Sequence, residues 1–113
     1  MHYEIVSTKK FDRNLKRLFK KYRSIRADVE ELKKELLKNP TMGDQLGANS
    51  YKVRMAITSK GGGKSGGARV ITCHMLVDVE NSEIYLLTIY DKGELDTVSM
   101  KQIKELKQET GLS

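Results

Sequence analysis

Five basic side chains with no acidic residue among them form the part of this sequence best suited to chemistry. No Asp or Glu occurs between Gln45 and Val77. The same stretch carries five basic residues, which are Lys52, Arg54, Lys60, Lys64 and Arg69. Ordinary surfaces intersperse charges of both signs, so a cluster of one sign indicates a site for an anion. We expect that anion to be a phosphate backbone.

The cations are spaced along a strand pattern. Apolar and polar side chains alternate over residues 51–58, and this period of two is typical of a strand with one face in a core. Lys52 and Arg54 then share the other face, about 6.6 Å apart along the strand. A glycine-rich loop over residues 61–67 follows, and Arg69 begins a second apolar run. The sequence therefore predicts a hairpin that gathers the five cations.

Simpler interpretations of this stretch stay open beside the anion site. Lysines on a strand face are often solvated surface, and they also protect edge strands from aggregation. The loop over residues 61–67 is equally explained as a simple mobile hairpin turn without a role in binding. A nucleotide-binding loop is excluded, because the Walker A motif needs a glycine where Thr58 stands and a helix after Ser65. The residues that follow, from Val70 on, have a strand pattern instead.

Length and composition limit the class of protein. We expect residues 1–113 to form a single domain with one modest core. The net charge of +6 and the pI of about 9.4 favour nucleic acid or an acidic protein as a partner. A single cysteine, Cys73, cannot form an internal disulfide, and no apolar run reaches the ~20 residues of a membrane span. We therefore expect a soluble cytoplasmic protein that does not contact membranes.

The order of the expected elements indicates an α+β fold. The expected elements are a strand at 3–7, a helix with its apolar stripe from Phe11 to Tyr22, a helix from Ile25 that Pro40 ends, a loop at 41–50, strands at 51–58, 68–78 and 84–90, and a helix along Met100, Ile103 and Leu106 that Gly111 stops. Ser7 or Thr8, then Ser24, and then Ser99 with Gln102 are the expected helix caps. This order predicts a mostly antiparallel four-stranded sheet with an N-terminal helical hairpin and a C-terminal helix.

Several segments together resemble the RelE/HigB branch of bacterial toxins. The segments are Phe11 with its lysine-rich helix, 36–40 (LLKNP), 51–54 (YKVR), 60–71 (KGGGKSGGARVI) and 85–92 (YLLTIYDK). The resemblance covers nearly the whole chain, and the lysine-glycine loop is its most specific part. It implies a RelE-like fold and the toxin component of a toxin–antitoxin system.

The activity that the resemblance implies is cleavage of messenger RNA on the ribosome. Such a toxin inhibits translation and arrests growth, needs no metal or other cofactor, is neutralised by a cognate antitoxin protein, and is expected to be a monomer when alone. The family's functional cations match Lys52, Arg54, Arg69 and Lys92 here. Several relatives have an aromatic residue beyond the fourth strand, but this chain has none after Tyr90. Either Tyr90 stacks on the base or the base is held differently.

RNA can be cut without a metal when its own 2′-hydroxyl attacks the adjacent phosphate. The reaction needs a base, stabilisation of charge on the phosphate, and an acid for the leaving 5′-oxygen. Crowding by like charges favours a neutral lysine, so Lys52 is our first choice for the base. The guanidinium groups of Arg54 and Arg69 are better phosphate clamps, and Lys92 is the candidate proton donor.

The remaining candidates have supporting roles or alternative ones. Lys60 and Lys64 can add phosphate contacts and, with Tyr90 and Lys92, are the other candidates for the base. Tyr90 either stacks on an unpaired base or belongs to the core. We interpret His74 as a strand residue with its hydrogen bonds satisfied, and His2 as incidental.

Two other functions compete with RNA cleavage. One is a non-catalytic toxin of the same fold that acts on a protein such as a topoisomerase; the cations Lys52, Arg54 and Arg69 count against it. The other is a plain RNA-binding module, which would explain the charge equally well. The fold by itself does not decide between them.

Overall fold

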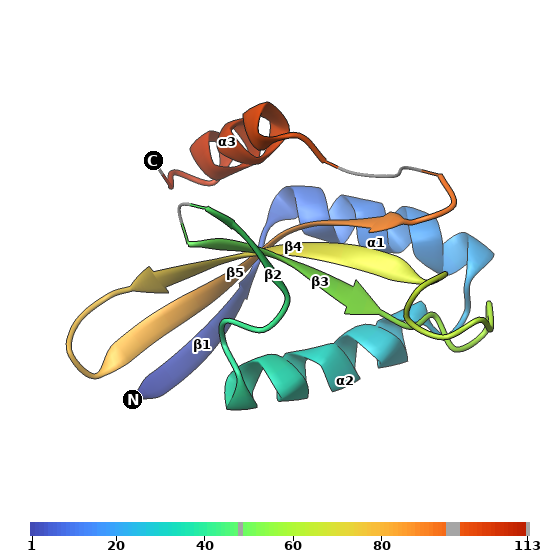
Figure 1. The fold of residues 1–113 in the computed structure, drawn as a ribbon, viewed down its shortest axis with the longest axis horizontal. Helices are drawn as coiled ribbons and strands as arrows, with labels where there is room; N and C mark the ends of the chain where they lie inside the picture. Colours follow the sequence, from blue (N-terminus) through green and yellow to red (C-terminus); the bar gives the residue numbers. More distant parts are fainter. Residues whose placement is uncertain (48, 95–97, 113) are drawn as a thin grey trace.

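Three helices and a five-stranded sheet form from the described part of the chain. The structure is a computed structural model that describes residues 1–47, 49–94 and 98–112. The elements are β1 (His2–Ser7), α1 (Lys9–Lys21), α2 (Ile25–Lys38), β2 (Asp44–Gly47), β3 (Ser50–Met55), β4 (Ala68–Leu76), β5 (Asn81–Asp91) and α3 (Met100–Glu109). The strand order across the sheet is β1-β5-β4-β3-β2 (Figure 1).

The predicted α+β class is confirmed, whereas the predicted sheet is wrong in detail. β1 runs parallel to β5, and the other three pairings are antiparallel, so the sheet is mixed. The fifth strand, β2, lies inside residues 41–50, which were expected to be a loop. Its four residues show no alternation that would predict a strand. They pair because the edge of β3 is open there, with Asp44 opposite Lys52.

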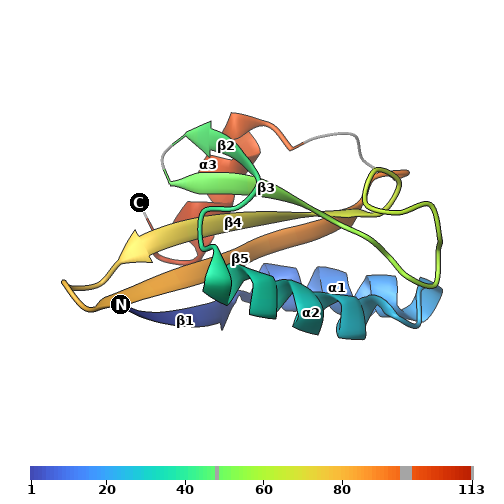
Figure 2. The same cartoon turned by 60° about the horizontal axis from the view of Figure 1, so that its bottom comes forward.

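The helices cover the two faces of the sheet separately. Figures 1 and 2 show α1 and α2 together on one side and α3 on the other. The larger core lies beneath α1 and α2 and includes Phe11, Leu18, Val53 and Val70, and the smaller core lies beneath α3. β5 therefore has buried residues on both faces, as its nearly continuous apolar run predicted. We call the side of the sheet beneath α3 the α3 face.

The expected helix ends are mostly confirmed. The hydroxyl of Thr8 accepts the backbone N–H of Phe11 and caps α1. Ser99 and Gln102 form the predicted capping box at the start of α3. Ser24 stands before α2, but its side chain makes no capping bond. Its hydroxyl instead donates to Asp28 and accepts from the backbone N–H of Ser59, so Ser24 occupies the predicted N-cap position without the capping bond.

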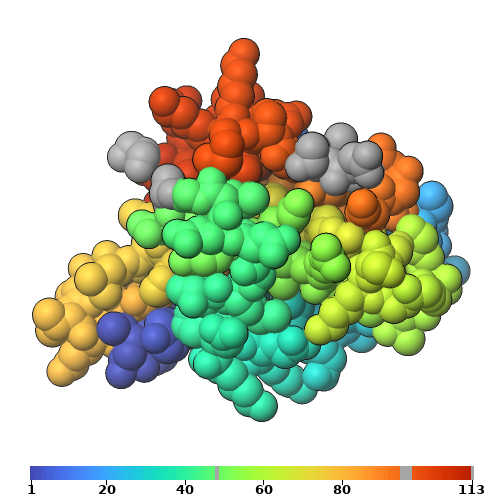
Figure 3. Space-filling model, in the orientation of Figure 1, coloured from blue at the N-terminus to red at the C-terminus, as the bar shows by residue number. Residues whose placement is uncertain are grey.

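The overall shape is elongated, and the two hairpin turns lie at its ends. The extents along the principal axes are 40, 28 and 23 Å. The loop between β3 and β4 lies at one end of the long axis, and the turn between β4 and β5 lies at the other (Figure 3). Within the described ranges, no helix combines the length and the apolar character needed to cross a bilayer.

Candidate functional site

The pairing of three strands brings predicted site residues into one row. In the antiparallel register Arg54 of β3 lies opposite Arg69 of β4, and Arg69 lies opposite Tyr90 of β5. Residues directly opposite each other in antiparallel strands point to the same face. Tyr90 belongs to the core beneath α3, so all three residues are on the α3 face. We call Arg54, Arg69 and Tyr90 the cross-strand row.

Lys52 extends this row along β3. It is two residues from Arg54 on the same strand and therefore points to the same face. Arg54 is exposed and Lys52 is half-buried. Across the β2–β3 pair, Lys52 lies opposite Asp44, the acidic residue just outside the acid-free stretch. The fold thus places beside Lys52 a carboxylate that lies outside the acid-free stretch of the sequence.

A small hollow at the free edge of β3 collects three of the candidate cations. β2 pairs with β3 only as far as Lys52, which leaves the edge of β3 open beyond it. Lys52, Arg54 and Lys64 line a hollow of about 190 Å³ at this edge, together with Asp44. We call it the β3-edge hollow. Its positive lining suits an anion of the size of a phosphate group.

Arg69 is buried and holds the loop that precedes it. Its side chain is 4% exposed. The guanidinium donates to the backbone carbonyls of Lys64 at 2.9 Å, Ser65 at 3.0 Å and Ala68 at 3.1 Å. The rigid fork of arginine donors matches such a set of carbonyls. Arg69 therefore fixes the part of the loop that carries Lys64, and its contact with a phosphate stays a prediction.

Lys60 has a counter-charge from a distant strand. Its ammonium lies 2.7 Å from a carboxylate oxygen of Asp91 at the end of β5. The hairpin has no acidic residue of its own, so the counter-charge of Lys60 comes from elsewhere in the chain. The hydrogen bond with Asp91 also raises the pKa of Lys60. The distant acid could not be found from the hairpin's own sequence.

Asp91 joins three parts of the chain. It is buried, and its carboxylate accepts from Lys60, from the hydroxyl of Tyr22 at 2.6 Å and from the backbone N–H of Gly93 at 3.0 Å. Burial raises the pKa of Asp91, but the hydrogen bonds from Lys60, Tyr22 and Gly93 outweigh it and lower the pKa to about 2. We call Asp91, Lys60 and Tyr22 the Asp91 cluster. It ties the loop to the junction of α1 and α2.

Tyr90 and Lys92 lie at and just beyond the end of β5. Lys92 is half-buried, and its backbone N–H donates to the carbonyl of Gly67 at 3.0 Å. Tyr90 is 4% exposed, so the core role left open for it is confirmed, and stacking on a base stays a prediction.

His74 lies in β4 as expected, but its Nε2 is buried and finds no hydrogen-bond partner within the described ranges. The prediction that its hydrogen bonds are satisfied is wrong.

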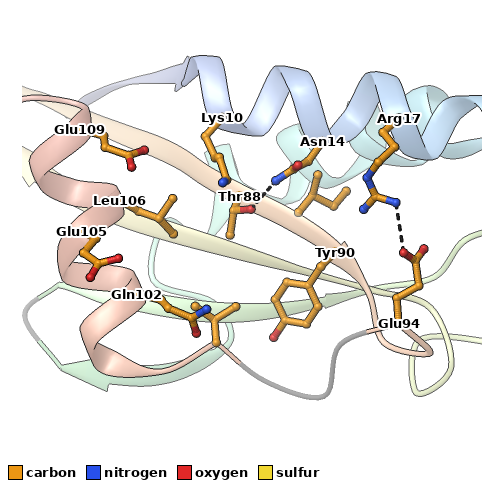
Figure 4. A pocket seen from close by; sticks show the side chains of 12 residues that line it. Lys10, Asn14, Arg17, Thr88, Tyr90, Glu94, Gln102, Glu105, Leu106 and Glu109 are labelled. Carbon is orange, nitrogen blue, oxygen red and sulfur yellow. Dashed lines mark hydrogen bonds and ion pairs between the residues drawn. The ribbon is translucent and has the colours of Figure 1, made fainter.

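A second hollow, which the sequence reasoning missed, lies between α1 and α3. It measures about 380 Å³, and Figure 4 shows side chains from both helices around it with Tyr90 at one side. Lys10, Asn14 and Arg17 line it from α1, and Gln102, Glu105 and Glu109 line it from α3. The spacing of three and four residues in each set indicates one helix side. We call this hollow the α1–α3 pocket.

Within residues 1–47, 49–94 and 98–112, no three His, Cys, Asp or Glu side chains gather as metal ligands would.

Comparison of the chain with models of known protein families gives no match. What the molecule does must therefore be argued from the arrangement of its own residues.

Proposed function

We propose that this protein is the toxin of a RelE/HigB-type toxin–antitoxin system, with a RelE-like fold, and that it cuts messenger RNA on the ribosome. The observation that carries the proposal is the cross-strand row, in which Arg54, Arg69 and Tyr90 come from three adjacent strands and share a face with Lys52. In this row the exposed guanidinium of Arg54 is the group that RNA can reach, and the buried Arg69 and Tyr90 lie beside it.

The reaction that suits these residues is attack by the 2′-hydroxyl on the adjacent phosphate. A bond forms between the 2′-oxygen and phosphorus, and the bond between phosphorus and the 5′-oxygen breaks. The products are a 2′,3′-cyclic phosphate and a 5′-hydroxyl. Lys52 acts as the general base and takes the proton of the 2′-hydroxyl. Lys92 protonates the leaving 5′-oxygen.

The arginines stabilise charge on the phosphate in two different ways. Arg54 is exposed beside the β3-edge hollow and can bind two phosphate oxygens at once. Arg69 is fixed by loop carbonyls, so its charge lies in a preorganised position and costs little reorganisation during the reaction. Lys64, on the same loop, adds a cation at the rim of the hollow. Together they hold the phosphate where Lys52 can act.

The surface of α1 supports a ribosomal substrate. Its exposed side chains are mostly cations, which are Lys9, Lys10, Arg13, Lys16, Arg17, Lys20 and Lys21. Such a surface attracts the phosphate backbone of ribosomal RNA. The same excess of positive charge suits an acidic segment of an antitoxin that covers the β3-edge hollow. Association with this antitoxin then slows as salt rises, and the whole system acts in the cytoplasm.

The proposal is tested by measuring whether protein synthesis or DNA synthesis stops first after expression begins. Expression is induced in a growing bacterial culture, and incorporation of labelled methionine and labelled thymidine is followed over the first minutes. We expect methionine incorporation to fall first, with growth arrest, and Arg54→Ala to delay that fall. An earlier fall of thymidine incorporation would favour the topoisomerase alternative. Unchanged growth and synthesis would contradict a toxin of any kind.

A further inference from the structure

The α1–α3 pocket is a built cavity that the proposed cleavage chemistry does not use. Three of its lining side chains are apolar and buried, namely Ile89 and Tyr90 from β5 and Leu106 from α3. Its volume of about 380 Å³ falls within the ~300–1,000 Å³ of small-molecule sites. Figure 4 shows α1 along one side and α3 along the other, with β5 between them. The α1–α3 pocket is therefore a slot between the two helices.

The two walls of the slot carry opposite charges. Lys10 and Arg17 belong to the α1 wall, and Glu105 and Glu109 belong to the α3 wall. Arg17 forms an ion pair with Glu94 at 3.1 Å and closes one end (Figure 4). Lys10 and the two glutamates are exposed. A ligand in the slot thus meets a donor on one wall and acceptors on the other.

Asn14 adds a further acceptor to the α1 wall. Its amide nitrogen donates to the hydroxyl of Thr88 at 2.8 Å. This bond fixes the orientation of the side chain, and the amide oxygen is then the group that it offers to a ligand. The buried apolar side chains, one cation and several acceptors together match a planar group with more than one N–H donor and an acceptor edge.

We propose that the α1–α3 pocket binds a guanine base of RNA, with Glu105 as the residue that reads it. The N1–H and the N2 amino group of guanine are adjacent donors, and a carboxylate accepts both at once. The O6 and N7 atoms are acceptors that suit the ammonium of Lys10. Adenine and cytosine place a ring-nitrogen acceptor beside their amino group, which repels a carboxylate. Guanine is therefore the base that this slot favours.

The place of the pocket relates it to the proposed cleavage site. Tyr90 belongs both to the cross-strand row and to the lining of the pocket. Two strand spacings, on the order of 10 Å, separate β5 from β3, so a base in the pocket and a phosphate near Arg54 can belong to neighbouring nucleotides. The assignment of the base to a messenger RNA rests on the proposed function. Recognition of guanine by the pocket does not.

The test compares guanosine and inosine 5′-monophosphate, because inosine lacks only the N2 amino group. Each nucleotide is titrated into the ¹⁵N-labelled full chain, and amide shifts of Thr88 and Leu106 report on the pocket. We expect the guanine nucleotide to bind about 10-fold more tightly, as for a lost base contact. Glu105→Gln should bring the two affinities together. Glu35→Gln, which removes an exposed carboxylate on α2, should leave the difference unchanged.

Equal affinities of the wild-type chain for the two nucleotides, or shifts confined to residues outside the pocket, would overturn the proposal. So would a difference that survives in Glu105→Gln. The binding measurement uses no ribosomes and no cleavage. Guanine selectivity without messenger cleavage would therefore contradict only the proposed function, and cleavage without selectivity would contradict only the role of the pocket.

Discussion

Lys52 and Arg54 lie two residues apart on β3, but the fold gives them different surroundings. Lys52 is half-buried opposite Asp44, whereas Arg54 is exposed at the free edge of the strand. An ammonium can lose its proton and act as a base, whereas a guanidinium stays charged in proteins. The two positions are therefore suited to different tasks, proton transfer at Lys52 and phosphate binding at Arg54.

Exchanging the two cation types should separate these tasks. Lys52→Arg keeps the charge but removes the base, so we expect the cutting step to slow by ~10²–10⁴-fold while binding to the ribosome is preserved. Arg54→Lys keeps a cation and loses only bidentate geometry, so its loss should be milder. Single-turnover cleavage on programmed ribosomes measures both. An unchanged rate in Lys52→Arg would show that another residue is the base.

Arg69 should be sensitive even to replacement by lysine. Arg69→Lys keeps the charge but cannot reproduce three hydrogen bonds to the carbonyls of Lys64, Ser65 and Ala68. We expect it to fold with a free energy of unfolding lower by ~1–3 kcal/mol and to show faster hydrogen exchange in the loop. Arg69→Ala should also abolish toxicity.

Arg23→Ala, which removes an exposed cation outside the site, serves as the control for the Arg69 variants. It should leave both the stability and the toxicity unchanged. An Arg69→Ala variant that folds and still arrests growth would contradict the place of Arg69 in the site.

The loop between β3 and β4 is held at several points along its length. Thr58 donates to Asp28 through both its backbone N–H and its hydroxyl. Lys60 then binds Asp91, and Arg69 holds the carbonyls of Lys64 and Ser65. The sequence predicted a glycine-rich loop and left open that it is a mobile hairpin turn. The structure shows instead that its two ends are fixed, with Gly61, Gly62 and Gly63 at positive φ between them.

The glycines of this loop should differ sharply in their tolerance of a side chain. A Cβ on Gly67 would lie 2.2 Å from the backbone oxygen of Met55, whereas one on Gly62 meets no atom within 4 Å. Gly62→Ala should cost ~1 kcal/mol, because its φ of +83° is unfavourable for alanine. Gly67→Ala must displace β3 or β4 and should cost several times more. Urea unfolding of the two variants measures the difference, and equal costs would refute the close approach at Gly67.

The elements with regular periodicity could be predicted, and those made by tertiary pairing could not. The stripe of α1, the alternation of β3 and the capping box at Ser99 are local patterns, and each is confirmed. β2 forms by pairing with the open edge of β3. No pattern in residues 44–47 predicts this strand. Gly43, with φ of +100°, precedes β2 and Gly47 is its last residue, but both glycines are compatible with a loop as well.

The same distinction applies to the candidate site. Lys52, Arg54 and Arg69 could be placed together because a hairpin joins neighbours in the sequence. Asp91 reaches Lys60 across 31 positions, and the α1–α3 pocket joins helices from opposite ends of the chain. Such partners depend on the packing of the whole sheet. Predicting such partners would require knowledge of how β4 pairs with β5 and of where the helices end.

At the scale of the whole molecule, the Asp91 cluster connects the loop, β5 and the helical hairpin. The pKa of Asp91 is about 2, below its ordinary value of 3.8. A lowered pKa stabilises the folded state above the ordinary pKa, and this contribution is lost as the pH falls from about 4 to about 2. At about 1.4 kcal/mol per pH unit, it corresponds to about 2 kcal/mol of unfolding free energy.

Removing the charge of Asp91 should therefore make the free energy of unfolding depend less on pH in acid. Asp91→Asn is expected to be less stable than the wild type near pH 6 and to lose less stability between pH 4 and pH 2. Urea unfolding at a series of pH values measures this, with Glu35→Gln as a control for the loss of an exposed carboxylate. Parallel pH profiles for wild type and Asp91→Asn would show that the cluster does not control acid stability.

The central claim is that the cations of β3 and β4 cut a messenger while it is being translated. Primer extension on a message in a reconstituted translation system, with and without ribosomes, tests it most directly. The account predicts discrete cuts within the translated region, present only when ribosomes are added and weaker with Arg54→Ala. Cuts of equal strength on naked RNA, or an intact message with the wild-type protein on translating ribosomes, would contradict it.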